Sequence, residues 1–576
     1  MQCARDKSGL KCDLLVVGSG AGGLSTAITA KLRGLDIIVI EKEAVFGGTT
    51  AFSGGVLWVP LSRHSRNSRE ADSKESLDEV RRYLRHEVGN FYRPEFVEAF
   101  LKHGPEMVEF FEDRAGVKFL PTEYPDYHPD APGGALRGRS IVAAPFNAAS
   151  LGSNLGRLRG PLETITFMGM MFNSSSADLK HFFNVTRSVA SLIYVIKRMS
   201  GHLVEMLVHG RGVQVTGGNA LAASLAKSAI EHGIEILAGT EAKELTIRDG
   251  AVSGVRVLRG ADCFDISSRY GVVLATGGFS HDRDRIKEAY PHVGRGGDHF
   301  SPVPKGNTGD GARLAESVGG RVTTDFPQPA AWMPVSKVPM APGRDVAFPH
   351  LLDRYKPGVI GVLKNGKRFT NESNSYHDVG VALIDACKGS AETCMWLICD
   401  SNALRKYGLG YVKPAPMPHS KMLKNGYLTK GDSVCSLAEE LGIDAGALES
   451  TVREYNEHAR RGVDIQFRRG TTAFNRFLGD PNHQPNPCVA PIERGPYYAV
   501  KVVLGDLGTF DGIETSVFGE VVRGKEIVPG LYAVGNDRAS LMGGTYPGAG
   551  ITLGPIMTFG YITANRIADR AEGSSS

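Results

Sequence analysis

The chain has 576 residues and a mass of 61.8 kDa, which is too long for one hydrophobic core and indicates at least two domains. Hydrophobic residues make up 42% of the chain and charged residues 22%, as in ordinary globular proteins, so a fibrous or disordered chain is excluded. The net charge of +4 is small and no long Lys/Arg block occurs, which argues against a nucleic-acid partner.

The cysteines, histidines and N-terminus bear on compartment and metal binding. The eight cysteines are scattered without a C-x-x-C pair, so we interpret them as unpaired thiols in a reducing compartment. The 16 histidines show no H-E-x-x-H spacing, and we expect no metal site. The N-terminus lacks the apolar region of a signal peptide, and no run of about 18 apolar residues predicts a spanning helix. These features favour a cytoplasmic protein.

The first predicted elements form a nucleotide-binding unit. Residues 13–17 read as a short buried strand, and residues 18–23 are a glycine-rich turn of the G-x-G-x-x-G type. A helix is expected over 24–32, then a strand over 36–40 that ends in Glu41. An acidic residue at the end of the second strand is where a ribose-binding carboxylate belongs. The unit therefore predicts dinucleotide binding.

Two later segments look like returns to the same sheet. Residues 271–278 and 530–537 each read as a strand that closes on a glycine turn. We therefore predict an α/β fold whose nucleotide domain is discontinuous, with a first part over 1–280 and a return segment over 491–576. A substrate domain is expected over 281–490.

Residues 161–209 form a distinct insertion within the first part. Its second half is amphipathic and basic, with Lys197 and Arg198 among apolar residues. One interpretation is peripheral contact with a membrane surface, where these cations face lipid headgroups. The other is a helical cover that packs on the main body or on a second subunit.

The most specific motif lies near the end of the chain. Residues 544–550 place the phenol of Tyr546 four residues before the backbone N–H of Gly550, just ahead of an apolar helical pattern. Two such donors can converge on one carbonyl oxygen, and a helix N-terminus would favour the negative charge that develops there. Together with the glycine turn at 18–23, the motif indicates a flavin enzyme that dehydrogenates beside a ketone.

These motifs carry a family resemblance. Over nearly the whole chain, apart from part of 161–209, the sequence resembles flavoproteins of the fumarate reductase/succinate dehydrogenase type and, within them, the 3-ketosteroid Δ1-dehydrogenases. The markers are residues 18–23, 41–42, 47–55, 126–129, 132–134, 307–311, 366–372 and 545–550. The nucleotide motifs are shared by the superfamily, whereas the tyrosine motifs are much narrower. Many relatives carry glutamate where this chain has Asn536, and the asparagine favours the ketosteroid group.

The resemblance implies FAD, a bilobal fold with a Rossmann-like FAD domain and an α+β capping domain, and four catalytic positions. Tyr546 and Gly550 would hold the ketone oxygen, and Tyr376 would take the α-proton with support from a hydrogen bond donated by Tyr127. The β-hydride would go to flavin N5. The implied cofactor-binding residues are Gly18, Ser19, Gly20, Ala21, Gly22, Gly23, Glu41, Lys42, Gly47, Gly48, Thr49, Thr50, Ser53, Gly54, Gly55, Ala275, Thr276, Gly277, Gly278, Gly535, Asn536, Gly550 and Leu553.

The leading hypothesis is a 3-oxosteroid Δ1-dehydrogenase, with a quinone or another carrier as the external electron acceptor. A relative that acts on another cyclic ketone, either a Δ4-(5α)-3-ketosteroid or an oxo-cyclohexane derivative, would keep FAD and the oxyanion clamp. A fumarate- or urocanate-type reductase would need an arginine acid in the cleft, and Arg354 or Arg538 are the candidates. A flavin-carrying binding protein without turnover is the remaining alternative.

Overall fold

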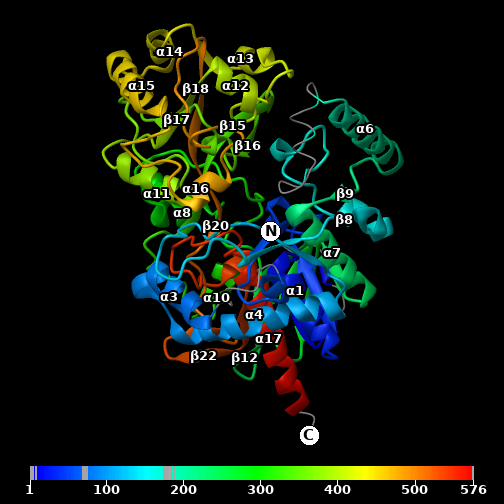
Figure 1. Cartoon of the computed structure of the whole chain (residues 1–576). Helices are drawn as coiled ribbons and strands as arrows, with labels where there is room; N and C mark the ends of the chain where they lie inside the picture. Colours follow the sequence, from blue (N-terminus) through cyan, green and yellow to red (C-terminus); the bar gives the residue numbers. More distant parts are fainter. Residues whose placement is uncertain are drawn as a thin grey trace.

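A computed structural model describes residues 5–6, 9–67, 76–172, 181, 185 and 188–573. The chain forms a lower lobe, which holds both ends of the sequence, and an upper lobe built from its middle (Figure 1). The first residues of the predicted nucleotide domain, and much of 173–187 within the predicted insertion at 161–209, lie outside the described residues.

The lower lobe is organised around a six-stranded sheet. Neighbouring strands in this sheet are parallel, except for the last pair in the spatial order, which is antiparallel. In spatial order the strands are β10 (Glu235–Ala238), β4 (Ile37–Glu41), β3 (Leu14–Val17), β14 (Val272–Leu274), β22 (Glu526–Ala533) and β21 (Glu520–Arg523). The expected strands at 13–17, 36–40, 271–278 and 530–537 are thus confirmed within a few residues, and they meet in one sheet.

Both faces of this sheet are covered. Leu14, Val16 and Val39 point to a core shared with α1 (Ala21–Leu32), α7 (Gly217–Glu231) and α17 (Leu553–Gly573). The alternating residues Leu15 and Val17 point to the other face. There they meet a mixed sheet of β1 (Arg5–Asp6), β13 (Asp262–Ser268), β12 (Ala251–Arg259) and β11 (Thr240–Arg248), with β2 (Leu10–Cys12) beside β13. Burial on both faces explains the continuous apolar run of β3.

The upper lobe contains a second six-stranded sheet, which is antiparallel throughout. Its strands are β16 (Arg344–Pro349), β15 (Ala330–Ala341), β20 (Tyr497–Thr509), β18 (Cys394–Asp400) and β17 (Val359–Val362), with β19 (Thr429–Gly431) beside β20. β20 follows the expected boundary at residue 490, yet it pairs with β15 and β18. The chain therefore returns to the lower lobe only after β20.

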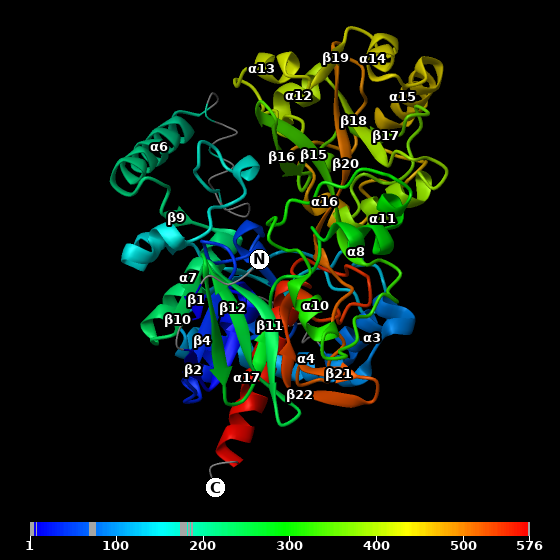
Figure 2. The same cartoon turned by 180° about the vertical axis from the view of Figure 1, so that it is seen from behind.

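Shorter elements complete the two lobes (Figure 2). Small sheets are formed by β5 (Val56–Trp58), β7 (Ser140–Ala143) and β6 (Phe119–Pro121), and by β8 (Phe146–Asn147) and β9 (Gln214–Val215). The remaining helices are α2 (Arg63–Asn67), α3 (Leu77–Val88), α4 (Pro94–Arg114), α6 (Val189–His209), α8 (Arg283–Ala289), α9 (Pro291–Gly294), α10 (Asp310–Glu316), α11 (Tyr376–Ala386), α12 (Ser401–Tyr407), α13 (Ser420–Lys424), α14 (Val434–Leu441), α15 (Ala445–Ala459) and α16 (Ala473–Phe477).

Helix α6 stands at the side of the molecule in both views (Figures 1 and 2). Of its 21 residues only Ser191, Val195 and His202 are buried. Its exposed apolar side chains include Ile193, Leu203 and Leu207, which is 78% exposed. None of the helices among the described residues has the length and hydropathy that crossing a bilayer requires.

One expectation about the cysteines is wrong. Cys263, on β13, is disulfide-bonded rather than a free thiol. The free cysteines of the described residues are Cys12, Cys387, Cys394, Cys399, Cys435 and Cys488. Spacing along the sequence could not reveal the bonded thiol, because a disulfide needs proximity in space rather than a C-x-x-C pattern.

Candidate active site

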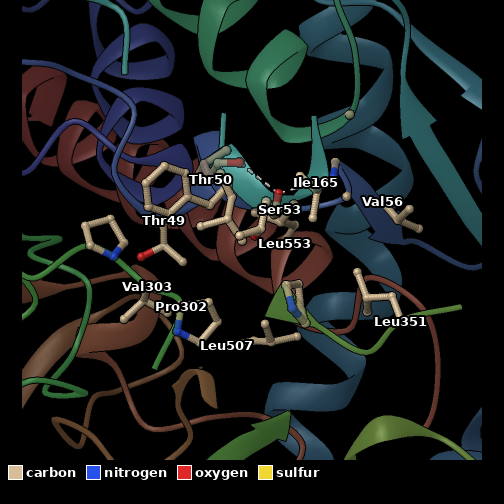
Figure 3. A pocket seen from close by; sticks show the side chains of 18 of the residues that line it. Thr49, Thr50, Ser53, Val56, Ile165, Pro302, Val303, Leu351, Leu507 and Leu553 are labelled. Carbon is tan, nitrogen blue, oxygen red and sulfur yellow. Dashed lines mark hydrogen bonds between the residues drawn. The ribbon is translucent and has the colours of Figure 1, made fainter. Parts of the chain in front are cut away.

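A cavity of about 920 Å³ runs between the lobes and is lined by residues of both. Figure 3 shows Thr49, Thr50, Ser53 and Leu553 on its wall, together with Leu351 and Leu507 from the upper lobe. The cavity is continuous from the glycine-rich turn of the lower lobe to the tyrosines named in the sequence analysis.

Most of the expected cofactor-binding residues line this cavity. Those that do are Gly18, Ser19, Gly20, Ala21, Gly22, Glu41, Lys42, Gly48, Thr49, Thr50, Ser53, Gly54, Gly55, Ala275, Thr276, Gly277, Gly535, Asn536, Gly550 and Leu553. Gly23, Gly47 and Gly278 do not line it. A side chain at Gly23 would meet the Gly18 carbonyl oxygen at 2.0 Å, so this glycine allows close packing of helix on strand.

Glu41 organises the nucleotide end of the cavity. It ends β4, and its Oε2 accepts hydrogen bonds from the Ser19 N–H at 3.1 Å and the Ser19 hydroxyl at 2.5 Å. Its Oε1 accepts from the Glu43 N–H at 2.9 Å. The neighbouring Lys42 amine donates to Asp310 at 2.6 Å and to Thr308 at 2.8 Å. The bonds from Ser19 and Glu43 fix the Glu41 carboxylate on the cavity wall.

The glycine turns leave room for a ligand. A side chain at Gly20 would meet nothing closer than 3.7 Å, and one at Gly535 would meet no atom within 4 Å, although both residues line the cavity. Gly20 is also the N-cap of α1, whose first turn carries no acidic residue. The positive end of that helix therefore faces open space, which suits a pyrophosphate. The residues present fit a dinucleotide.

Three tyrosines from distant parts of the chain meet at the other end. The Tyr127 hydroxyl donates to the Tyr376 oxygen at 3.2 Å. The Tyr546 ring centroid lies 5.0 Å from that of Tyr376 and 5.7 Å from that of Tyr127. All three side chains are under 10% exposed and line the cavity.

Burial controls the ionisation of this cluster. It raises the pKa of Tyr127 and Tyr376 well above the ordinary value of a phenol, and it raises the pKa of Tyr546 as well. The hydrogen bond from Tyr127 was expected to stabilise a phenolate at Tyr376. The bond is present, but it lowers the pKa of Tyr127 and adds to the rise at Tyr376, so both hydroxyls are protonated at neutral pH in the free protein.

Gly550 lies beside the tyrosines in a conformation that few other residues adopt. Its φ is +90°, and a side chain there would meet the Val56 carbonyl oxygen at 2.5 Å. Its own carbonyl accepts from Trp58 N–H at 2.9 Å and from Gly554 N–H at 3.0 Å. Its N–H donates to no other described residue. β5 and the start of α17 thus hold the peptide and leave a donor on the cavity wall.

Other lining residues carried no clear sequence signal. Pro302, Val303 and Pro304, the start of β11, and an apolar wall that includes Leu351 and Leu507 all contribute to the cavity. Asn307 donates to the Thr49 hydroxyl at 2.9 Å and to the Gly277 carbonyl at 3.0 Å. The 307–311 motif, a marker of the family resemblance, was the sequence signal for this loop.

The two arginines considered for a reductase are not on the wall of this cavity. Arg354 is fully buried, and its guanidinium donates to the carbonyl oxygens of His350 and Glu372. Arg538 donates to the Thr515 hydroxyl and stacks on Phe559. Neither side chain is available as an acid at the tyrosine cluster.

Comparison with known proteins shows the family of the chain. Residues 13–553 match a family model described as "FAD binding domain". The chain is 40% identical to a 4-oxocyclohex-2-ene-1-carboxylate 5-dehydrogenase from Sinomonas cyclohexanicum, over 97% of this chain and 94% of that protein. It is 35% identical to a 3-oxosteroid 1-dehydrogenase from Mycolicibacterium smegmatis, over 98% and 99% of the two chains.

A solved structure is also similar. The crystal structure of 3-ketosteroid Δ1-dehydrogenase from Sterolibacterium denitrificans, in complex with 1,4-androstadiene-3,17-dione, superposes with a TM-score of 0.87 at 32% identity, and 97% of this chain and 100% of that chain are covered. The chain is thus an FAD-binding α/β flavoprotein. It belongs to the family that includes the 3-oxosteroid 1-dehydrogenases and the dehydrogenases of oxo-cyclohexane carboxylates.

Proposed function

We propose that the protein is an FAD-dependent 3-oxosteroid Δ1-dehydrogenase, which introduces a 1,2 double bond into the A-ring of a 3-ketosteroid. The observation that carries the proposal is the cluster of Tyr127, Tyr376 and Tyr546 beside the Gly550 N–H, within one largely apolar cavity. The similar 3-oxosteroid 1-dehydrogenases support the substrate class.

In this proposal Tyr546 and Gly550 hold the ketone oxygen. The Tyr546 hydroxyl and the Gly550 N–H donate to it, which polarises the carbonyl and acidifies the neighbouring carbon. As the α-proton leaves, negative charge moves to the oxygen, where both donors gain strength. One donor of this kind typically contributes about 3 kcal/mol to the transition state.

Tyr376 is the proposed base. Because burial raises its pKa, the phenolate is a minor species near neutral pH, and the Tyr127 hydroxyl must donate to it when it forms. The proton removed from the α-carbon then resides on the Tyr376 oxygen and leaves through the Tyr127 hydroxyl. Bound FAD would supply the hydride acceptor at flavin N5, and an external carrier such as a quinone would reoxidise it.

The cofactor-binding residues that line the cavity would hold FAD in the Rossmann-like lower lobe. Glu41 would accept hydrogen bonds from the adenosine ribose, and the N-terminus of α1 would face the pyrophosphate. We propose the upper lobe as an α+β capping domain that supplies Tyr376 and the apolar wall.

The first experiment is anaerobic. The purified yellow protein is mixed with androst-4-ene-3,17-dione, the visible flavin band is followed, and the product is identified. Bleaching with a new 1,2 double bond is the expected result. Bleaching only with a 5α-steroid or a cyclohexanone derivative would show that the substrate is a different ketone. No bleaching with any ketone would refute the proposal.

A second candidate is dehydrogenation of an oxo-cyclohexane carboxylate. The relative that is 40% identical supports it, and so does Lys413. This lysine lines the cavity with its amine 5.0 Å from the Tyr411 ring centroid. Burial lowers its pKa, and no carboxylate among the described residues offsets that effect. A substrate carboxylate would provide the missing counter-charge.

The two candidates are separated by comparing substrates. With 4-oxocyclohexanecarboxylate, the second candidate predicts faster flavin bleaching than with the steroid dione. It also predicts that Lys413→Met weakens carboxylate binding and leaves steroid binding unchanged. Lys421→Met, at an exposed position on α13, is the control. An equal effect of Lys413→Met on both substrates would remove the lysine from recognition.

We also propose that α6 rests on a membrane surface. Two of its side chains, Val195 and Met199, line the cavity, whereas Ile193 and Leu207 are exposed apolar residues of the same helix. Lys197 would face anionic headgroups. A sparingly soluble steroid could then enter the cavity directly from lipid.

The test uses point variants, because deleting 161–209 would also remove cavity wall between Leu162 and Phe172. Ile193→Asp and Leu207→Asp should abolish binding to anionic liposomes and leave the flavin spectrum intact. Ile465→Asp, at another exposed apolar position, is the control. Liposome binding that survives both α6 substitutions would refute membrane contact.

A further inference from the structure

Three side chains, two of which are close neighbours of Tyr127 and Tyr376 in the sequence, form a hydrogen-bonded chain. His128 follows Tyr127 in the sequence, and Asp378 lies two residues after Tyr376. The Nδ1 atom of His128 is 2.7 Å from Glu87 Oε2, and its Nε2 atom is 3.0 Å from Asp378 Oδ2. The imidazole therefore bridges two carboxylates, one on each side.

This geometry requires a charged imidazole. Since ionised carboxylates only accept hydrogen bonds, both ring nitrogens of His128 must donate. Burial opposes the charge, but the hydrogen bonds to Asp378 and Glu87 raise the pKa of His128 to about 10. Burial likewise disfavours a charged Asp378, yet His128 lowers the pKa of that carboxyl below its usual value. His128 and Asp378 are thus both ionised in the neutral range.

The bridge joins elements of different lobes. Glu87 belongs to the last turn of α3, and Asp378 belongs to the first turn of α11 (Figure 1). Asp378 is itself fixed, because Ser375 caps α11 by accepting its N–H at 3.1 Å and also donates to its carboxylate at 2.8 Å. Asp378 is therefore held within the first turn of α11, which begins at Tyr376, so the position of Asp378 constrains that of Tyr376.

The partner tyrosine is fixed from its own side. The Tyr127 N–H donates to the Pro547 carbonyl at 2.9 Å, and Tyr83 donates to the same oxygen. These contacts tie Tyr127 to the segment of Tyr546 but not to α11. The 3.2 Å distance between the Tyr127 and Tyr376 hydroxyls therefore depends on how the two lobes are held together. The hydrogen bond between His128 and Asp378 joins the lobes close to this point, because His128 is next to Tyr127 in the sequence and Asp378 is two residues from Tyr376.

We infer that His128 is a positioning residue for proton removal, and this inference rests on the proposed function. As a cation between two carboxylates of different lobes, it sets the separation of the Tyr127 and Tyr376 hydroxyls. The other titratable groups around it are Tyr83 and His86 on α3 and His377 on α11. A misplacement of about 1 Å between reacting groups can cost about a hundredfold in rate.

The test separates proton removal from ketone binding. His128→Gln and Asp378→Asn are each compared with the wild-type holoenzyme in D₂O, and deuterium uptake at the α-carbon of the bound ketone is measured beside flavin bleaching. We expect both rates to fall about a hundredfold, with FAD content and KM near the wild-type values. His86→Gln, which removes an exposed histidine next to Glu87, should behave as the wild type.

Two results would overturn the inference. One is deuterium uptake by His128→Gln within about threefold of the wild type, and the other is a parallel loss of FAD or ketone binding. If His128→Gln does not fold, a variant with Glu87→Gln, His128→Gln and Asp378→Asn removes the unbalanced carboxylates and carries the same expectation. A wild-type protein that no ketone bleaches would instead refute the proposed function.

Discussion

Removing the Tyr546 hydroxyl is the most direct test of the proposed clamp. Tyr546→Phe keeps the ring, which is 4% exposed and packs between Tyr127, Tyr376 and Phe510. Only one oxygen atom is lost, so the packing of the cluster should survive. The change to the fold is therefore small, whereas one of the two proposed donors to the ketone oxygen disappears.

The two effects differ in size. A buried hydroxyl contributes about 1 kcal/mol to stability per hydrogen bond, and the Tyr546 hydroxyl interacts with Tyr376 and Thr552, so the melting temperature should fall by only a few degrees. Loss of one oxyanion donor costs about 3 kcal/mol in the transition state, which corresponds to about a hundredfold in kcat. We therefore expect Tyr546→Phe to be a stable, yellow protein with strongly reduced turnover.

The assay is the rate of anaerobic flavin bleaching by the ketone at saturating concentration. Tyr355→Phe is a matched control, since Tyr355 is also a buried tyrosine on the cavity wall. Its hydroxyl donates to the Asn374 carbonyl at 3.1 Å, so it serves the fold rather than the ketone. The control should lose some stability and little rate. Comparable rate losses in the two variants, or bleaching by Tyr546→Phe within threefold of the wild type, would refute the clamp.

Three further predictions concern pH, backbone and buried charge. Because burial raises the pKa of Tyr376, the fraction of Tyr376 present as phenolate increases about tenfold per pH unit, and the rate of bleaching should rise steadily from neutral to alkaline pH. A maximum of the rate near neutral pH would contradict the assignment of Tyr376 as the base. Gly550→Ala places a side chain 2.5 Å from the Val56 oxygen and should lower kcat about a hundredfold. Gly152→Ala, where no other atom lies within 4 Å of the added side chain, should leave kcat unchanged, and equal kcat values in the two variants would exclude Gly550 from the clamp. Glu372→Ala leaves Arg368 and Arg469 buried without their shared carboxylate and should cost about 3–5 kcal/mol in urea unfolding, and a loss under 1 kcal/mol would refute that estimate.

The nucleotide-binding half of the fold could be predicted because its signals are local. The apolar run of β3, the glycine turn and Glu41 stand next to one another in the sequence. β20 could not be assigned in the same way. Its buried run at 497–509 suits either sheet, and only long-range pairing with β15 and β18 decides between them.

The tyrosine cluster could be predicted only through motifs. Tyr127 and Tyr376 are 249 positions apart, and no spacing rule brings them together. The apolar wall around Leu351 has no periodic pattern, because loops supply much of it, so it was missed. The pKa of Tyr376 also depends on burial, which a sequence motif does not report.

The undivided cavity has a thermodynamic consequence. The residues that suit a dinucleotide and the tyrosines that suit a ketone line a single space, with no wall of the protein between them. Each bound molecule would therefore complete the other's surroundings. By linkage, if a bound ketone raises the affinity for the dinucleotide by some factor, a bound dinucleotide must raise the affinity for the ketone by the same factor. On heating, the two molecules should therefore be released together rather than one after the other.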